Sequence, residues 1–254
     1  MLSKEKIEKE LVSLGIAPPK IIFYEEIDST NTRAKLYAKE NPGNKENVIF
    51  IANSQTGGRG RRGRSFVSNE GAGIYMSILS YPKKNGYQST RTTAMAAVSL
   101  CRAVESLLDC EIKIKWVNDL FLGGKKLAGI LTEGEMDDNG KIAYQVVGMG
   151  INVYKSAISD EISSIATSLE SELNSVPDRS TLAAEIIKEF LYAEKDCYDE
   201  YKARSLVIGR RVTVIKLTES YDAEVLDINE DFSLKISTKH GIENLFTGEV
   251  SLKI

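Results

Sequence analysis

Four arginines and four glycines share residues 57–64, which run Gly-Gly-Arg-Gly-Arg-Arg-Gly-Arg. The guanidinium group offers a planar fork of donors that matches phosphate or carboxylate, and glycine lets the backbone approach such a group closely. We therefore expect this basic segment to bind an anion and, because its like charges repel one another, to stay mobile until the anion arrives. A solvated arginine-rich turn or an RNA-binding tract would have the same composition, so the surroundings of the segment have to decide.

Two further clusters of polar residues could complete such a site. Residues 28–31, Asp-Ser-Thr-Asn, are suited to capping the helix that follows, and they exceed what a helix N-cap requires. Residues 112–119 alternate and end on Asn118 and Asp119, and a Gly-Gly turn then leads into another strand. This hairpin would bring Asn118, Asp119 and Lys126 close together. Taken alone, an ordinary N-cap and an ordinary hairpin with surface lysines explain the same residues.

The composition leaves little room for histidine or cysteine chemistry. His240 is the single histidine and stands in a predicted turn between two short strands, so a histidine-dependent triad or a histidine-rich zinc site is not expected. Cys101, Cys110 and Cys197 lack metal-ligand spacing, and buried reduced thiols in a cytoplasm are the simplest account of them. Any reaction must therefore use lysine, arginine, aspartate and asparagine.

The overall composition is that of a soluble globular protein: 254 residues, 42% hydrophobic and 27% charged, with a net charge of -3. This acidic balance argues against a protein that mainly coats nucleic acid or an anionic membrane, so the basic segment is local chemistry. The first residues lack the apolar core of a signal peptide, and no apolar run approaches the roughly 20 residues needed to span a bilayer. A cytoplasmic location is expected.

Hydrophobic patterning places the basic segment between two predicted buried strands, at 48–52 and 74–79. Further strands are predicted at 21–24, 112–119, 125–131 and 142–147, and helices at 3–14, 30–39, 92–108, 161–173 and 180–202. Short strands follow at 211–216, 223–228, 234–237 and 249–253. We expect two domains, residues 1–205, whose first 20 residues are a helix and a linker, and a small β-barrel at 206–254.

Five motifs occur in an order that resembles the biotin protein ligases, enzymes that join biotin to a lysine of a carrier protein with ATP. They are Ser29-Thr30-Asn31, Gln55 with Gly58 to Arg64, Lys115-Trp116-Val117-Asn118-Asp119, Lys126-Leu127-Ala128-Gly129-Ile130 and Gly148-Met149-Gly150-Ile151-Asn152. The resemblance runs from about Tyr24 to the C-terminus. It implies an α+β fold, with a class II synthetase-like mixed sheet that has helices on one side, followed by a small SH3-like β-barrel. It also implies the monofunctional type, because the leading residues are too few for the N-terminal winged helix of some members.

The resemblance implies a role for each motif residue. Biotin would be held by Ser29, Thr30, Asn31, Gln55, Arg59, Gly60, Arg61, Lys126 and Gly129. ATP would be held by Gly58, Arg59, Arg61, Arg64, Phe66, Asn118, Lys126 and Asn152, with Mg²⁺ on the phosphates and no assigned protein ligand for the metal. Arg61 and Lys126 would be catalytic at the junction of the biotin carboxylate and the α-phosphate, and Asp119 would be catalytic by aiming the acceptor amine.

The implied reaction has two steps. The biotin carboxylate attacks the α-phosphate of ATP to give biotinyl-5'-AMP and pyrophosphate, and the carrier lysine then attacks the acyl carbon and releases AMP. The first step brings an anion against a polyanion and requires fixed positive charges. The basic segment should also close as a lid that shelters the adenylate from water. The expected partner is the biotin carboxyl carrier protein of a carboxylase, with no DNA, no membrane, and a monomer or a homodimer as the assembly.

Two residues depart from the family pattern: Val117 stands where many members have proline, and Phe66 where tryptophan is common. Three other functions compete with biotin ligation. A lipoate ligase would share the fold and the chemistry, but its glycine-rich stretch ending in histidine is missing here. A nucleic-acid-binding module would bind with a steep salt dependence. An interaction protein would dock partners through its barrel and release no pyrophosphate from ATP.

Overall fold

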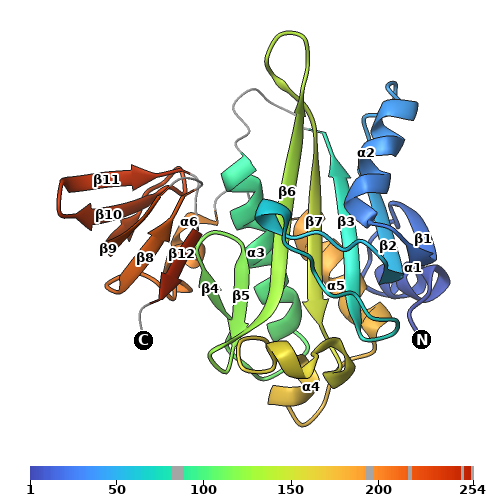
Figure 1. The fold of residues 1–254 in the computed structure, drawn as a ribbon. Coiled ribbons are helices and arrows are strands. Elements are labelled where there is room, and N and C mark those ends of the chain that lie inside the picture. The colour runs from blue at the N-terminus through green and yellow to red at the C-terminus, as the bar shows by residue number, and fades with distance from the viewer. Residues whose placement is uncertain (82–88, 193–196, 217–218, 247–248, 253–254) are drawn as a thin grey trace.

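A seven-stranded mixed β-sheet forms the centre of the protein (Figure 1). The computed structural model describes residues 1–81, 89–192, 197–216, 219–246 and 249–252. The strands of the large sheet are β1 (Lys20–Ile27), β2 (Val48–Gln55), β3 (Gly73–Ser80), β4 (Lys113–Lys115), β5 (Asp119–Leu122), β6 (Lys125–Met136) and β7 (Ile142–Asn152). They lie in the order β1-β2-β3-β7-β6-β5-β4, in which β1 and β2 are parallel and the other neighbours are antiparallel.

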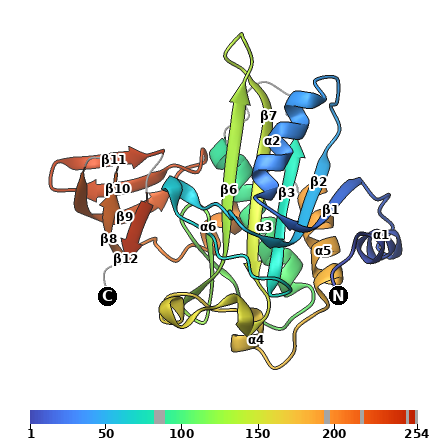
Figure 2. The ribbon, with the colours of Figure 1, turned by 45° about the vertical axis from the view of Figure 1, so that its right-hand side comes forward.

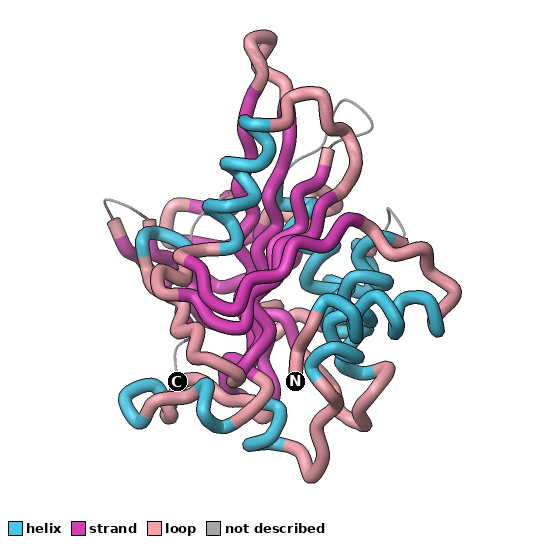
Figure 3. The backbone as a smooth tube through the Cα atoms, turned by 90° about the vertical axis from the view of Figure 1, so that its right-hand side faces the viewer, coloured by secondary structure: helices cyan, strands magenta, loops and turns pink. Residues whose placement is uncertain are grey.

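Helices lie on both faces of this sheet, as Figure 3 shows. One face is covered by α1 (Lys4–Ser13), α3 (Ser89–Glu105) and α5 (Arg179–Leu191), and the other carries α2 (Thr30–Glu40). Ile49 and Ile51 of β2 join the core of the first face, whereas Val48 and Phe50 pack with Ala34 of α2. Successive side chains of a strand point to opposite faces, so a strand covered on both sides is apolar throughout. The helices α1, α3 and α5 therefore lie on one side of the sheet, as expected, and α2 lies on the other side.

A five-stranded antiparallel sheet follows, with the strand order β11-β10-β9-β8-β12. Its strands are β8 (Arg211–Ile215), β9 (Ser220–Ile228), β10 (Leu234–Thr238), β11 (Gly241–Leu245) and β12 (Glu249–Leu252). The strand β11 adds to the four that the sequence predicts, and His240 lies in the turn before it, as expected. Residue 253, where the last predicted strand ends, lies outside the described residues. A mixed sheet with helices followed by a small β unit confirms the expected fold class.

The helix predicted at 161–173 is wrong as one element. This stretch holds a 3-10 turn at Asp160–Ile162 and the short helix α4 (Leu169–Glu172), after another 3-10 turn at Lys155–Ala157. Between them residues 163–165 form a turn, and Ala166 then makes an isolated parallel β-bridge with Lys126 at the start of β6. The Lys126 backbone N–H donates to Ile165 O at 3.0 Å, and Thr167 N–H donates to Lys126 O at 2.9 Å. A strand partner therefore overrides the helical pattern of the sequence.

The helix predicted at 180–202 corresponds to α5 and α6 (Tyr198–Ala203), with residues 193–196 outside the described residues. The helix predicted at 92–108 begins earlier, at Ser89, and ends at Glu105. Within the part of the chain that the structure describes, every helix is too short or too polar to cross a membrane.

The basic segment lies in the connection between β2 and β3, as the sequence predicts. Figure 2 shows this connection reaching across from the large sheet to the C-terminal sheet, where it comes next to β12. Arg61–Gly63 form a 3-10 turn in which Arg62 has a φ of 56°, in the left-handed region that few residues other than glycine adopt. The basic segment thus lies between the large sheet and the C-terminal sheet.

Candidate active site

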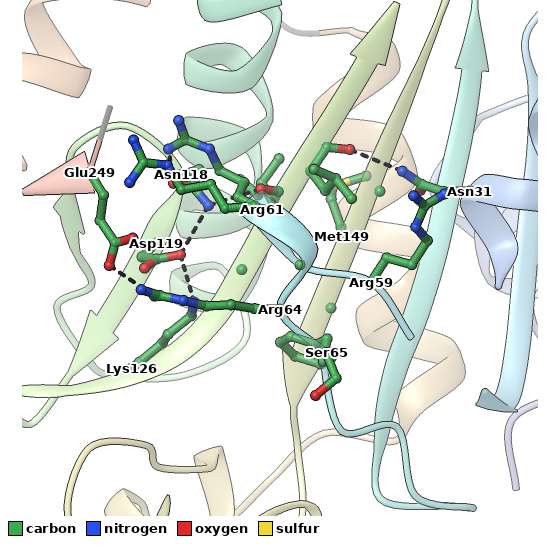
Figure 4. A pocket seen from close by; sticks show the side chains of 18 of the residues that line it. Asn31, Arg59, Arg61, Arg64, Ser65, Asn118, Asp119, Lys126, Met149 and Glu249 are labelled. Atoms are coloured by element: carbon green, nitrogen blue, oxygen red, sulfur yellow. Dashed lines mark hydrogen bonds and ion pairs between the residues drawn. The ribbon is translucent and has the colours of Figure 1, made fainter. Parts of the chain in front are cut away.

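The expected ligand-binding residues converge on one pocket (Figure 4). Its walls come from the N-terminus of α2, the basic segment, the end of β4, the β5–β6 hairpin and β7. The predicted residues that line it are Ser29, Thr30, Asn31, Gln55, Arg59, Gly60, Arg61, Arg64, Phe66, Asn118, Asp119, Lys126 and Gly129. Residues separated by as much as a hundred positions in the sequence thus meet around one space.

Two predicted residues lie elsewhere. Gly58 lines an adjoining hollow that shares several residues of the basic segment with the pocket, and its carbonyl accepts a hydrogen bond from Phe66 N–H at 2.9 Å. A Cβ at Gly58 would stand 2.2 Å from Phe66 O, so glycine is required for this close approach. Asn152 is buried at the end of β7 and donates from Nδ2 to Thr167 O at 3.0 Å, outside the residues that line the pocket.

Four polar side chains form a connected cluster where the basic segment meets the β5–β6 hairpin. Arg61 Nη1 donates to Asn118 Oδ1 at 2.8 Å, and Asn118 Nδ2 donates to Asp119 Oδ1 at 3.1 Å. Lys126 Nζ lies 2.7 Å from the same Asp119 oxygen. The predicted closeness of Asn118, Asp119 and Lys126 is therefore confirmed, and Arg61 joins them through Asn118.

The described residues of the pocket wall include six cationic side chains and two carboxylates. The cations are Arg59, Arg61, Arg62, Arg64, Lys115 and Lys126, and the carboxylates are Asp119 and Glu249. Burial lowers the pKa of Arg61, Asp119 opposes that shift, and an arginine stays cationic at neutral pH. An excess of fixed positive charge in a partly buried site can neutralise an anionic ligand and a polyanionic one at the same time.

The N-terminus of α2 forms the opposite wall. Ser29 is the N-cap, and its side chain accepts from Thr32 N–H at 3.5 Å. Thr30 N–H donates to Gln55 Oε1 at 2.9 Å, and Gln55 Nε2 donates to Ser68 Oγ at 2.9 Å. These bonds fix the orientation of the Gln55 amide and tie the start of α2 to the end of β2. The surplus polar residues at 28–31 are therefore partly structural and partly presented to the pocket.

The backbone before Asn118 is supported from the C-terminal side of the chain. Trp116 Nε1 donates to Phe232 O at 2.9 Å, and the buried Tyr201 hydroxyl donates to Val117 O at 3.0 Å. The rings of Tyr201 and Phe232 pack edge to face with centroids 5.4 Å apart. The Trp116–Val117 peptide bond is cis. Groups far along the chain therefore hold the start of the β5–β6 hairpin in place.

Glycines in β7 make room for two pocket residues. A Cβ at Gly148 would stand 2.2 Å from Asn31 Oδ1, and a Cβ at Gly150 would stand 2.6 Å from the ring of Phe66. The Phe66 ring also meets Tyr75 edge to face, with centroids 6.4 Å apart. The glycines of the Gly-Met-Gly pattern thus let Asn31 and Phe66 approach the sheet closely, and the same three residues line the pocket.

Several residues of the site have no signal in the local sequence. Arg64 Nη1 donates to Glu249 Oε1 at 2.9 Å, and Arg62 Nη2 donates to Ile215 O at 2.8 Å, so both arginines reach the C-terminal sheet. Glu133 of β6 accepts from Lys35 Nζ at 2.8 Å. Such partners lie about a hundred or more residues apart, and a single sequence does not pair them.

Comparison with known proteins agrees with this geometry. The family described as biotin/lipoate A/B protein ligase matches residues 23–152. The bifunctional ligase/repressor BirA of Bacillus spizizenii is 29% identical over 246 residues, covering 91% of this chain and 74% of the relative. The biotin–[acetyl-CoA-carboxylase] ligase of Mycobacterium tuberculosis is 29% identical over 225 residues, covering 84% and 81%.

A solved structure shares the fold over nearly the whole chain. The biotin protein ligase from Aquifex aeolicus, in complex with biotin and ATP, superposes with a TM-score of 0.76 at 27% identity. The match covers 92% of this chain and 98% of that one. It therefore includes both the large sheet and the C-terminal sheet. The family match spans half of the chain and contains most of the pocket, and the chain belongs to the biotin/lipoate A/B protein ligase family.

Proposed function

We propose that the protein activates biotin with ATP as biotinyl-5'-AMP and then transfers the biotinyl group to a lysine of a biotin carboxyl carrier protein. The observation that carries this proposal is the meeting of two unlike walls in one pocket. One wall is the cationic cluster around Arg61 and Lys126, and the other is the hydrogen-bonding wall of Ser29, Thr30 and Asn31. A small polar ring with an anionic tail needs both walls. Relatives named as biotin ligases, and a neighbour with biotin and ATP, support it.

In the first step the cations have to offset repulsion between the biotin carboxylate and the α-phosphate. Arg61 is positioned by Asn118, and Lys126 is positioned by Asp119, so both charges are oriented before the ligands arrive. Preorganised charges stabilise developing negative charge without reorganising in the transition state. Arg59 and Arg64, which line the same pocket, would bind the phosphates. We assign the junction of carboxylate and phosphate to Arg61 and Lys126.

In the second step the acceptor lysine has to be neutral and aimed at the acyl carbon. An unperturbed lysine amine with a pKa of about 10.4 is neutral only about once in 2,500 at pH 7. Asp119, which pairs with Lys126 in the pocket wall, would accept a hydrogen bond from the amine of the acceptor lysine. An ordinary carboxylate is a weak base, so orientation is the assigned role.

Mg²⁺ would arrive on the phosphates of ATP and supply charge neutralisation there. Among the described residues no group of three or more histidine, cysteine, aspartate or glutamate side chains could hold a metal alone. The pocket does offer oxygen atoms from Asn118, Asp119 and Glu249, the donor type that this ion prefers. These three residues would be the candidate protein ligands of a metal that is mainly carried by the nucleotide.

We further propose a boundary between two domains near residue 205. Residues on either side of it still pair with β4 of the large sheet, since Ile114 N–H donates to Arg204 O at 2.8 Å and Leu206 N–H donates to Ile114 O at 2.9 Å. The C-terminal sheet begins soon afterwards, at Arg211. A cytoplasmic location and a monomeric or homodimeric state complete the proposal.

The test combines partial and complete reactions. Purified protein should exchange labelled pyrophosphate into ATP when biotin and Mg²⁺ are present, and should add one biotinyl mass to a single lysine of a biotin carboxyl carrier domain. Lipoate in place of biotin should support neither reaction. Exchange that depends on lipoate instead of biotin, or the absence of any exchange, would contradict the proposal.

A further inference from the structure

The amide of Asn31 is held on every side by the protein. Asn31 is 4% exposed, and its Nδ2 donates to Glu133 Oε2 at 2.9 Å and to Leu131 O at 3.3 Å. Its Oδ1 accepts from Ser77 Oγ at 2.6 Å. An amide nitrogen has two hydrogens and an amide oxygen has two acceptor lone pairs. Both donors are therefore used inside the protein, and one acceptor position remains.

Glu133 decides which way this amide points. Burial alone would raise the pKa of Glu133, but hydrogen bonds from Lys35 and Asn31 outweigh burial and hold that pKa below its ordinary value. Arg59 Nη1, 4.0 Å from Glu133 Oε1, adds a second positive charge. An ionised carboxylate only accepts hydrogen bonds, so a flipped amide would place its oxygen against the acceptors of Glu133 and Leu131. The hydroxyl of Ser77 can donate or accept and fits either orientation.

The oxygen edge of the amide faces Gly148 of β7. A Cβ at Gly148 would come nearer to Asn31 Oδ1, at 2.2 Å, than to Nδ2, at 3.1 Å, and both residues line the pocket. The dashed line from Asn31 in Figure 4 shows Nδ2 engaged with the backbone of β6. A ligand that reaches this wall would therefore meet the side-chain oxygen of Asn31, because both N–H groups of the amide are bonded to β6.

We propose that Glu133 is a specificity-determining positioning residue, which makes Asn31 an acceptor that selects ligands with an N–H group at this point of the pocket. The inference rests on the proposed function, because the ureido ring of biotin carries N–H groups on both sides of its carbonyl. The dithiolane ring of lipoate carries none. A buried site built to pair with an N–H rejects an analogue that lacks it, since the protein acceptor would stay unpaired.

The test measures binding of biotin and of two cyclic carbamate analogues, each with one ureido N–H replaced by a ring oxygen. Isothermal titration calorimetry gives each Kd for the parent protein, for Glu133→Gln and for Glu135→Gln. Glutamine both donates and accepts, so either orientation of Asn31 becomes hydrogen-bonded in Glu133→Gln. Glu135 is exposed on the same strand and serves as the matched control.

In the parent and in Glu135→Gln, one carbamate should bind at least about 100-fold more weakly than biotin. In Glu133→Gln the Kd of biotin should rise about tenfold, and the ratio between that carbamate and biotin should fall about tenfold or more. A merely structural ion pair between α2 and β6 would weaken both ligands equally and leave the ratio unchanged. An unchanged ratio, or a parent that binds both carbamates as tightly as biotin, would overturn the proposal.

The results that would contradict the role of Glu133 differ from the results that would contradict the proposed function. A parent protein that binds biotin but does not exchange pyrophosphate would contradict biotin activation, and the effect of Glu133 on the ratio would still be measured. A parent that exchanges pyrophosphate normally while Glu133→Gln keeps the parent ratio would contradict only the role of Glu133. A parent that binds no biotin would contradict both. Equal thermal midpoints of the variants would exclude general unfolding as the cause.

Discussion

Lys126 of β6 and Asp119 of β5 form an ion pair, with Lys126 Nζ 2.7 Å from Asp119 Oδ1, although their partners in the strand register are Phe121 and Gly129. Each side chain is partly exposed to the pocket, 36% for the lysine and 23% for the aspartate. The cation assigned to the first step and the carboxylate assigned to the second therefore orient each other before substrate arrives. An anionic ligand has to compete with Asp119 for Lys126, and in doing so it leaves the carboxylate available to an incoming amine.

Replacing Lys126 with glutamine should slow adenylate formation by about 10²–10³-fold, since it removes a preorganised charge at the reacting centre. Biotin-dependent pyrophosphate exchange measures this step. Lys125→Gln is the matched control, because the neighbouring Lys125 Nζ donates to Ser163 O at 2.8 Å and does not line the pocket. Equal exchange rates for the two variants would contradict the role of Lys126.

Replacing Asp119 with asparagine should affect the second step more than the first. Supplied with preformed biotinyl-5'-AMP, Asp119→Asn should transfer biotin to a carrier domain at least about tenfold more slowly than the parent, because an oriented acceptor for the amine is lost. Single-turnover transfer measures this effect. If transfer keeps the parent rate while pyrophosphate exchange falls, Asp119 serves only to orient Lys126.

A methyl group at Gly148 should disrupt the hydrogen-bonding wall of Ser29, Thr30 and Asn31. Its Cβ would stand 2.2 Å from Asn31 Oδ1, and Asn31 cannot yield easily because it is held by three hydrogen bonds. Gly148→Ala should therefore lower the free energy of unfolding by about 1–3 kcal/mol and weaken biotin binding. In Gly134→Ala the nearest atom would lie at 3.7 Å, an ordinary contact, and binding should be unchanged. Urea unfolding and titration calorimetry measure the two effects, and equal biotin affinities would contradict the prediction.

The contact between Arg64 and Glu249 should affect how easily a protease cleaves the basic segment more than it affects the free energy of unfolding. Arg64 is 66% exposed, and an exposed ion pair contributes about 0–1 kcal/mol at most. Glu249→Gln should thus change unfolding little but speed limited proteolysis within residues 58–64, and biotin with ATP should slow that cleavage if the segment is a lid. Glu224→Gln, on an exposed position of β9, is the control. Cleavage that is the same in both variants and indifferent to ligands would contradict the coupling and the lid.

Local sequence patterns predict those parts of the site whose geometry is local. The hairpin that joins Asp119 to Lys126 follows from Gly123 and Gly124, whose φ values of 58° and 80° are those that a glycine turn supplies. The N-cap at Ser29 and the position of the basic segment between two strands follow in the same way. Each of these features is encoded by residues that follow one another along the chain.

The remaining parts depend on partners that the chain brings from far away. Asn31 obtains its orientation from Glu133, 102 residues along the chain, and Arg64 obtains its partner from Glu249, 185 residues along. The stretch between residues 162 and 169 contains a turn and an isolated parallel β-bridge between Ala166 and Lys126, although its own pattern favours a helix. No local preference encodes such partners, so the sequence predicts Asn31 and Arg64 as site residues but predicts neither Glu133 nor Glu249.

Glu200 should make the stability of the protein depend on pH in mildly acidic solution. It accepts from Arg204 Nη2 at 2.8 Å and from Arg102 Nε at 2.9 Å, which joins α6 to α3. Burial would raise the pKa of Glu200, but these hydrogen bonds outweigh burial and lower that pKa below its ordinary value of 4.5. A carboxyl group whose folded pKa is depressed contributes stability above its unfolded pKa and loses that contribution as pH falls through the folded pKa.

Glu200→Gln should accordingly lower the free energy of unfolding by about 1–3 kcal/mol at pH 7, the range for hydrogen bonds to charged groups. The difference between parent and variant should be constant above the ordinary pKa of 4.5 and should shrink as the pH falls below it. Urea unfolding at a series of pH values measures this difference, in which the titration of all other groups cancels. Glu161→Gln, at an exposed position, should match the parent throughout. A difference that stays constant through the acidic range would mean that the two arginines do not depress the pKa of Glu200.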